Sequence, residues 1–366
     1  MENGLYIDMK VIQINATYGI GSTGIIAKEI AYECVQHHIK PYVAYSKGYG
    51  KVEYGVEGYE IGSWLDHKIH ALLCRIAGKQ AYFSKEPTRS LLSYMDSIRP
   101  DVVHLHNLHS NYINLDMLLE YLAMKSIRTV ITLHDCWYFT GGCFHYTSVG
   151  CEKWKTHCGN CIKRFDDTPA YFRDASAQIQ SDRIDYLSRI EDLTFVGVSE
   201  WITQQVRESR LKDVGRITCI HNGFNLETFR YRNSDLSNRL GLEGKFVILG
   251  PATKWLQMIN VDTLQYFTEH MPEDAILLLF GASCIRSGLP PNVRLYGFIS
   301  GREEMAQMYS MADVMANCSR EDSLSSLNIE AQACGTPVVT YEATGSRETV
   351  DAGFSVPTGD YSRLFE

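Results

Sequence analysis

Residues 319–350, SREDSLSSLNIEAQACGTPVVTYEATGSRETV, have the order of a polar loop, a helix, a strand and a tight turn. Gly335 and Pro337 end the predicted helix, because glycine adopts the left-handed conformation of a helix C-terminus and proline cannot continue a helix. The apolar residues 338–341 predict the strand, and Gly345 allows the turn that follows. A helix followed directly by a strand is typical of a parallel α/β sheet.

The start of this helix is suited to a diphosphate. The helix opens at Ser325 and Ser326, where backbone amides without intrahelical partners can bind phosphate oxygens. Glu330 lies one turn or so inside, and an acid there can accept hydrogen bonds from both hydroxyls of a ribose. The alternative is an acidic helix cap in a packed helix–strand turn that binds nothing.

The rest of the chain alternates in the same way. Short β-branched runs predict strands, and segments with helical spacing of apolar residues separate them. We expect an α/β protein with two doubly wound, Rossmann-like domains and a ligand cleft between them, at residues 1–228 and 240–366. The first strand series lies at 9–15, 40–46, 101–106, 129–135, 193–199 and 216–223, and the second at 245–250, 275–281, 292–298, 313–319 and 336–342.

The composition is that of an ordinary globular protein. A chain of 366 residues suits two domains, and a net charge of −8 argues against a nucleic-acid partner. We find no signal peptide, and no apolar run approaches the ~20 residues of a membrane span. Five of the 11 cysteines lie between Cys136 and Cys161, a distribution that suits a reducing cytoplasm. We expect a soluble cytoplasmic protein; work at the inner face of the membrane on a lipid-linked substrate is left open.

Two features of the first half also predict ligand contacts. Residues 15–24 hold three glycines, Gly19, Gly21 and Gly24, before a helix, so the backbone there can approach a ligand closely. Histidines lie at the carboxyl ends of two predicted strands, at His106 and His134. A histidine without context is more often structural, but carboxyl ends of parallel strands face the ligand site in doubly wound folds.

The stretch quoted first resembles the E-x7-E region of the retaining glycosyltransferases of family 4, which have the two-domain GT-B fold. That region has the form E-D-x-[YFL]-P-x-x-x-x-E-A-x-A-C-G-T-P-V. This chain matches it at Glu321, Asp322, Leu324, Glu330, Ala331, Ala333, Cys334, Gly335, Thr336, Pro337 and Val338. Ser325 replaces the usual proline. A match of this length favours a nucleotide site over a simple helix cap.

The resemblance implies transfer of a hexose, with retention, from a nucleotide-diphosphate sugar to a hydroxyl of a glycan or lipid-linked acceptor, as in bacterial surface-polysaccharide assembly. No metal or other cofactor is expected for catalysis. The resemblance implies that Asp322 lies near the donor sugar, that Glu330 holds the ribose, and that Ser323 and Ser326 belong to the donor site.

It also gives roles in the first half of the chain. The loop Gly21–Ser22–Thr23–Gly24 resembles the G-S-T-G loop that faces the donor, so Gly21 and Gly24 are donor-binding candidates. The histidine of a T-[LF]-H-[DT] turn contacts the transferred sugar in the family, and we assign that role to His134. His106 and His109 remain candidates for acceptor contacts.

A cysteine-rich insertion near residues 136–165 contains Cys143, Cys151, Cys158 and Cys161. The last two have the spacing that lets both thiolates reach one tetrahedral metal. A structural zinc would hold an insertion that otherwise lacks a core. Reduced, partly buried thiols are the equally weighted alternative.

The chain departs from the family in two places. Relatives have W-x-x-R-K-G-L after the first strand of the second domain, whereas this chain has Met258, Ile259 and Asn260 in place of the R-K-G. The two lost cations neutralise the donor diphosphate in the family, and Lys254 is the nearest substitute. The sequence also ends at Glu366, where further helices are expected, so we expect a shortened second domain.

These departures leave alternatives open. One is a catalytically weak or inactive member that binds a sugar nucleotide or a partner protein. Another is a phosphorylase or an epimerase on the same architecture, although the cofactor lysine or extra basic residues of a phosphorylase are not found. Turnover of a sugar nucleotide would separate an enzyme from a binding protein.

Overall fold

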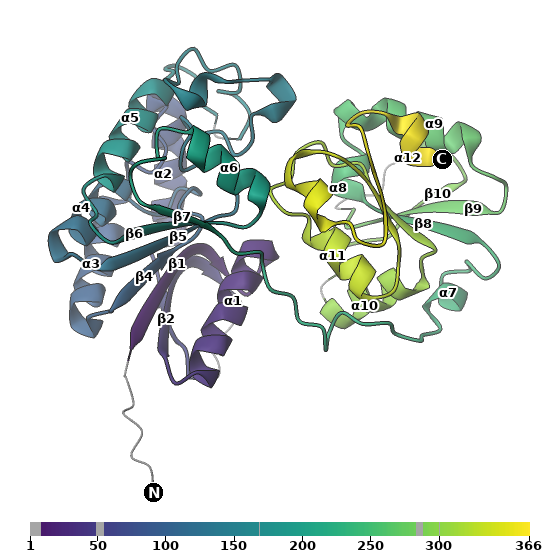
Figure 1. Ribbon diagram of the computed structural model, residues 1–366, viewed down its shortest axis with the longest axis horizontal. Coiled ribbons are helices and arrows are strands. Elements are labelled where there is room, and N and C mark those ends of the chain that lie inside the picture. The colour runs from purple at the N-terminus through teal and green to yellow at the C-terminus, as the bar shows by residue number, and fades with distance from the viewer. Residues whose placement is uncertain (1–8, 49–54, 168, 283–287, 300) are drawn as a thin grey trace, which may run out of the picture. The chain divides into compact units, whose positions relative to one another are not determined.

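The computed structural model describes residues 9–48, 55–167, 169–282, 288–299 and 301–366. The described chain divides into two compact units, the first ending at Asn222 and the second starting at Gly223 (Figure 1). Each unit has a parallel sheet with helices on its faces, so the expected fold class is confirmed.

The first unit is built on a parallel sheet in the order β3-β2-β1-β4-β5-β6-β7. Chain order reverses between β1 and β4, which makes this pair the switch point where doubly wound sheets bind ligands. The side chains of Ile12, Ile14, Val103 and Ile131 are completely buried, as expected for strands covered on both faces. The strands are β1 Lys10–Tyr18, β2 Lys40–Gly48, β3 Glu57–Glu60, β4 Val102–Leu105, β5 Arg128–Leu133, β6 Leu193–Gly197 and β7 Arg216–Cys219.

Helices connect these strands and cover the sheet. They are α1 Gly21–Gln36, α2 Trp64–Ala77, α3 Lys85–Ile98, α4 Leu115–Lys125, α5 Ser176–Leu187 and α6 Glu200–Glu208, with short 3-10 turns η1 Thr147–Val149 and η2 Lys153–Lys155. The cysteine-rich segment therefore lies between β5 and α5, after the carboxyl end of a central strand.

The second unit repeats the pattern with the strand order β10-β9-β8-β11-β12-β13 and a switch point between β8 and β11. Alternate residues of each strand pack on opposite faces: Leu249 and Leu278 belong to one hydrophobic cluster, Ile248 and Leu277 to the other. The strands are β8 Phe246–Pro251, β9 Ala275–Phe280, β10 Val293–Leu295, β11 Val314–Asn317, β12 Val338–Tyr341 and β13 Gly353–Val356. The helices and 3-10 turns are α7 Leu236–Arg239, α8 Ala252–Trp255, η3 Met258–Asn260, α9 Val261–His270, α10 Arg302–Met311, α11 Ser326–Ala333, η4 Thr344–Thr349 and α12 Tyr361–Phe365.

The polar stretch 229–245, whose composition is typical of a connection between domains, packs on the second unit. Phe229, Leu236 and Leu242 are each at most 3% exposed and join one of the hydrophobic clusters of the second unit. Three apolar residues spaced along a polar stretch are thus enough to fix it onto the sheet.

Candidate active site

The loop before α11 and the start of that helix are held by two side-chain amides, one from β11 and one from α11 itself. Asn317, the last residue of β11, donates from Nδ2 to Ser325 Oγ at 3.0 Å and to Asn328 Oδ1 at 2.8 Å. Asn328 in turn donates to Thr349 Oγ1 at 2.9 Å. Ser325 does not cap the helix with its side chain, so the first-turn amides keep their capacity to bind an anion.

Glu330 lies on the second turn of α11. Its Oε2 accepts a hydrogen bond from the hydroxyl of the buried Tyr309 at 3.0 Å. Burial raises the pKa of Glu330 to about 7, although Tyr309 and the charge of Arg302 act in the opposite direction. A buried carboxylate without a direct ion-pair partner is costly to ionise, and hydrogen bonds from ribose hydroxyls would offset that cost.

Asp322 and Ser323 lie in the same loop but differ in their contacts. Asp322 is tied to the turn after β12, because its amide donates to Thr344 Oγ1 at 2.8 Å and its carbonyl accepts from the Gly345 amide at 2.9 Å. Ser323 is 3% exposed, and its Oγ has no hydrogen-bond partner among the described residues. The Oγ of Ser346, in η4, is buried and unpartnered in the same way. Two orphaned hydroxyls beside one loop suit a polar ligand that would satisfy them.

Two cations lie near the switch point of the second unit. Lys254 is on α8, which follows β8, and Arg320 follows β11; both lower the pKa of the buried Cys318, although burial raises it overall to about 12. Arg320 Nε donates to Asn260 Oδ1 at 2.9 Å. Asn260 stands at a position where the family motif has glycine, and in the structure it positions a cation.

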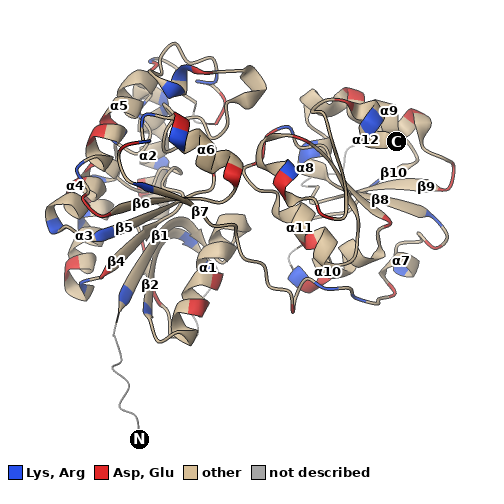
Figure 2. Cartoon of the chain, viewed as in Figure 1, with Lys and Arg blue, Asp and Glu red and all other residues tan. Residues whose placement is uncertain are grey.

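The residues at the positions of the lost family cations do not contribute charge here. Met258 is 84% exposed and Ile259 is 48% exposed, both in η3. Among the described residues, basic and acidic side chains are interspersed over the elements of both units (Figure 2). Lys254 and Arg320, the cations beside the α11 loop, are therefore not part of a broad basic surface among the described residues.

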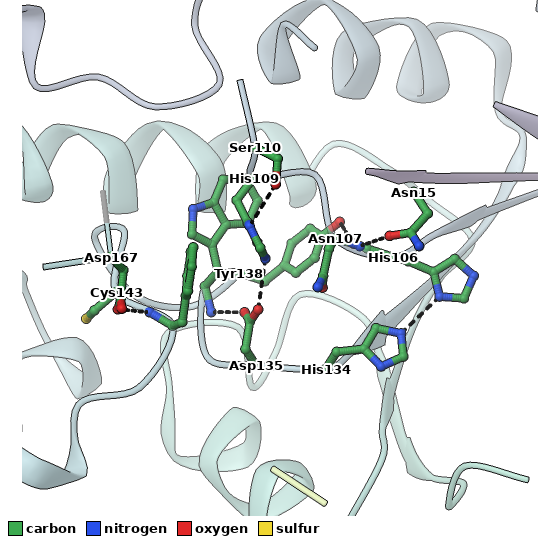
Figure 3. A network of polar contacts seen from close by, with 12 residues as sticks. Asn15, His106, Asn107, His109, Ser110, His134, Asp135, Tyr138, Cys143 and Asp167 are labelled. Carbon is green, nitrogen blue, oxygen red and sulfur yellow. Dashed lines mark hydrogen bonds and ion pairs between the residues drawn. The ribbon is translucent and has the colours of Figure 1, made fainter. Parts of the chain in front are cut away.

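In the first unit, a buried hydrogen-bonded series runs from the sheet to His134. Gln13 donates from Nε2 to the Ala27 carbonyl at 2.9 Å, which leaves its Oε1 to accept from His106 Nε2 at 3.0 Å. His106 Nδ1 lies 3.0 Å from His134 Nε2 (Figure 3). Burial lowers the pKa of His134 to about 4 and that of His106 well below its ordinary value, so both rings are neutral at pH 7.

These contacts determine the tautomer of His134. A neutral His106 that donates from Nε2 must accept at Nδ1, so His134 donates from Nε2. The Nδ1 of His134 is then unprotonated and can accept a hydrogen bond from a hydroxyl. His106 is completely buried, and it contacts His134 and Gln13. Its expected acceptor contact stays a prediction.

His109 and Asp135 form a second pair beside this series. His109 Nε2 lies 2.9 Å from Asp135 Oδ2, and the two side chains are each 12% exposed (Figure 3). Burial opposes ionisation of Asp135, but His109 and the amide of Trp137 hold its pKa below the usual value. The ring of His109 lies against Phe144 of the cysteine-rich segment, with centroids 4.1 Å apart.

Gly21 and Gly24 are glycine for different structural reasons. Gly21 has a φ of +64° and open space where a side chain would stand. A Cβ at Gly24 would lie 2.6 Å from Thr17 Oγ1, so this glycine lets α1 pack closely on β1. The N-terminus of α1 has no side-chain cap, so its first amides, beginning at Gly21, can bind an anion.

The cysteine-rich segment has an aromatic core of its own, contrary to expectation. Phe139, Tyr146 and Trp154 are each at most 3% exposed and pack together, with the rings of Tyr146 and Trp154 4.7 Å apart. The guanidinium of the buried Arg183 lies 3.6 Å over the ring of Trp137 and donates to the Thr140 carbonyl. The segment therefore has packing contacts of its own.

The four cysteines of the segment line one small, mostly apolar cavity of about 30 Å³, at Cys143, Cys151, Cys158 and Cys161. Burial raises the pKa of Cys143 to about 12 and that of Cys158 to about 11. Within the described ranges, no group of three or more His, Cys, Asp or Glu side chains is placed to hold a metal ion. The structure does not support the zinc interpretation.

Two family models match consecutive parts of the chain. The model described as Glycosyltransferase Family 4 matches residues 24–228, which is more than half of the chain, and the model described as Glycosyl transferases group 1 matches residues 245–366. The chain belongs to this glycosyltransferase family. The GT-B glycosyltransferase expected from residues 321–338 is thereby confirmed.

Curated relatives of this glycosyltransferase include WcaC of Escherichia coli (strain K12), whose name describes a glycosyl transferase of colanic acid biosynthesis. It is 23% identical over 353 residues, which are 93% of this chain and 85% of WcaC. The D-inositol 3-phosphate glycosyltransferase of Xylanimonas cellulosilytica is 30% identical over 160 residues, 38% of each protein.

Solved structures share the fold at low identity. Sucrose-phosphate synthase from Thermosynechococcus elongatus has a TM-score of 0.67 at 16% identity, over 98% of this chain and 88% of that one. HepE of Anabaena, solved in complex with UDP-glucose, has a TM-score of 0.62 at 16% identity with the same coverage. The glycosyltransferase WaaG has a TM-score of 0.62 at 11% identity, over 97% of this chain and 88% of WaaG.

Proposed function

We propose that this glycosyltransferase moves a hexose from a nucleotide-diphosphate sugar to a hydroxyl of a glycan or lipid-linked acceptor, with retention of anomeric configuration. The observation that carries the proposal is the buried Glu330, placed on the second turn of a helix whose first amides have no side-chain cap. This arrangement suits a ribose next to a diphosphate.

The donor diphosphate would bind the amides at the start of α11, where Ser326 begins the helix, and the cations Lys254 and Arg320. Positive groups held in place before the reaction stabilise the charge that develops on the leaving diphosphate. The unpartnered hydroxyl of Ser323 would donate to the same ligand. Arg320 supplies a cation that the family motif does not count, so we favour turnover over binding alone.

The sugar end of the donor would be oriented by Asp322 and His134, as the family resemblance implies. His134 presents an unprotonated Nδ1 and is neutral, so it can accept a hydrogen bond from a sugar hydroxyl without adding charge. Gly21 and the amides that start α1 would face the donor as well. His109, held by Asp135 and Phe144, is the residue of the histidine group that we propose for acceptor contacts.

No metal or cofactor enters this proposal as a catalytic group. Surface-polysaccharide assembly is the proposed setting, since WcaC has a name that refers to colanic acid biosynthesis. None of the described helices is long and apolar enough to cross a membrane. We propose a cytoplasmic enzyme that meets its acceptor at the inner face of the membrane.

Turnover of a panel of nucleotide sugars tests the proposal. The purified chain, with lipid extract or oligosaccharide as acceptor, should release nucleoside diphosphate from at least one donor, and His134→Ala should reduce the release at least about 100-fold. A surface variant, Met124→Ala, with its side chain 77% exposed on α4, serves as the control. Binding of a donor without any release would leave the chain a binding protein and contradict the proposal.

A further inference from the structure

Helix α2 has its apolar side outward. Six large apolar side chains of its 14 residues are exposed, by 37% to 71%: Trp64, Leu65, Ile69, Leu72, Leu73 and Ile76. His70, in contrast, is 1% exposed and faces the protein. Surface helices of globular proteins normally have the opposite arrangement, with the apolar stripe against the core.

Polar contacts fix this orientation. His70 Nδ1 lies 2.6 Å from Ser84 Oγ, and His67 Nε2 lies 2.8 Å from the Ile61 carbonyl. Ser63 and Asp66 form a capping box at the start of the helix. The exposed stripe is therefore specified by the inward side of the helix, which cannot rotate without breaking these hydrogen bonds.

A second group of exposed apolar residues adjoins the end of α2. The amide of Tyr171 donates to the Arg75 carbonyl at 3.0 Å, and Gly78 packs so closely on Arg173 that a Cβ would lie 2.0 Å from its carbonyl oxygen. Tyr171 is 54% exposed and Phe172 is 79% exposed. The stripe on α2 and these two aromatic residues together are called the α2 face below.

Basic side chains stand on and beside this face, in a chain whose net charge is −8. Lys68, Arg75 and Arg173 are exposed, and Lys68 Nζ lies 5.5 Å from the ring of Trp64. The acid of the helix, Asp66, is engaged in the capping box. Apolar and aromatic side chains with lysine and arginine at their edge are suited to the headgroup region of an anionic bilayer.

A polar cavity of about 140 Å³ lies against the same helix. Its lining includes Cys74, Arg75 and Gly78 from the end of α2, and Arg164, Asp167, Asp174 and Ser176 from the residues before and at the start of α5. One buried atom in this lining, Arg164 Nε, has no hydrogen-bond partner among the described residues. An acceptor with its lipid in the bilayer and its polar head in this cavity would satisfy it.

We propose that the α2 face docks this chain on the surface of an anionic bilayer, where a lipid-linked acceptor is held beside it. This proposal rests on the proposed function in one respect only, the identity of the acceptor. Membrane binding itself requires neither donor nor turnover, so the two can fail separately.

Vesicle flotation tests the docking surface. The full chain should bind vesicles of phosphatidylcholine with 30 mol% phosphatidylglycerol, and binding should weaken in pure phosphatidylcholine and at high salt. Ile69→Glu/Leu72→Glu should reduce binding at least about tenfold. The matched control, Met124→Glu/Phe354→Glu, also changes two exposed apolar side chains to acids and should bind as the wild type does.

The remaining measurements separate the outcomes. Both double variants should keep the thermal unfolding midpoint and the nucleotide affinity of the wild type, since neither touches the donor site. Equal vesicle binding by the wild type and the α2 variant, or no binding by the wild type, would overturn the proposal. A dimer in sedimentation velocity that only the α2 variant dissociates would show that a second copy covers the face instead.

Discussion

The Nδ1 atom of His106 lies 3.0 Å from Nε2 of His134, deep at the carboxyl ends of two neighbouring strands. The Gln13 amide on the far side of His106 determines which nitrogen of each ring carries the proton. The tautomer of His134, the candidate sugar-binding histidine, is thus determined by Gln13 in the middle of β1.

Replacing Gln13 should change the tautomer of His134 without removing it. In Gln13→Met, His106 loses its acceptor and can place its proton on Nδ1, where it no longer accepts from His134. We expect transfer to fall about tenfold with little change in nucleotide affinity. Imidazole ¹⁵N shifts should report the altered tautomer. Thr132→Val, which removes the contact of the neighbouring His104, is the control and should leave the His134 signals in place. Unaltered His134 signals in Gln13→Met would argue against the relay.

Nucleotide binding should strengthen as the pH rises through about 7. The pKa of Glu330 is raised to about 7 by burial, and ribose hydroxyls donate to its ionised form, so binding lowers that pKa and releases a proton. Calorimetry from pH 5.5 to 8.5 with a bound nucleotide sugar should show the largest change in affinity near pH 7. Glu330→Gln should bind weakly at every pH. An affinity of the wild type that does not vary with pH would contradict this account.

The same substitution should stabilise the unliganded chain at high pH. The folded-state pKa of Glu330 is raised above the ordinary 4.5, so ionisation of Glu330 lowers the free energy of unfolding as the pH rises from about 4.5 to 7. Above pH 7 this loss stays constant. Glu330→Gln removes a cost on the order of 1–3 kcal/mol at pH 8 and almost none at pH 4.5. Urea unfolding at the two pH values measures the difference. A variant less stable than the wild type at pH 8 would mean that the carboxylate is a structural group.

Arg320 should contribute to the affinity for diphosphates but not for nucleosides. Its replacement by alanine removes a charge-assisted contact, so we expect a loss of roughly tenfold or more for the nucleoside diphosphate and almost none for the nucleoside. Competition binding with the two ligands measures the ratio. Arg239→Ala, which removes a surface ion pair with Asp235, is the matched control. Equal losses for both ligands would indicate a general effect on the loop.

Much of the fold follows from the sequence because the strands are buried on both faces. Continuous apolar runs such as residues 275–281 predict central parallel strands, and the structure has β9 there with every side chain buried. The short β3 escaped prediction, since Glu57–Glu60 at the sheet edge carries two exposed acids and no apolar pattern. Its pairing with β2 is a tertiary feature that no local pattern encodes.

The candidate site was predicted in part, because a motif identifies residues but not the groups that hold them. Gln13 and Asn317 were missed, although each is a polar residue within an apolar strand, a signal that marks a buried hydrogen bond. Arg320 was missed because it stands far in sequence from the lost Arg-Lys pair. The zinc interpretation relied on the cysteine spacing and on an insertion expected to lack a core, and it overlooked the aromatic residues that already supply a core to the segment.

Calorimetric titration of the wild type and Glu330→Ala with nucleoside diphosphates tests the central claim, a donor site at the start of α11, most directly. We predict saturable binding with one site per chain for the wild type and no measurable binding for the variant, at unchanged fold by circular dichroism. The same affinity in both proteins would contradict the claim.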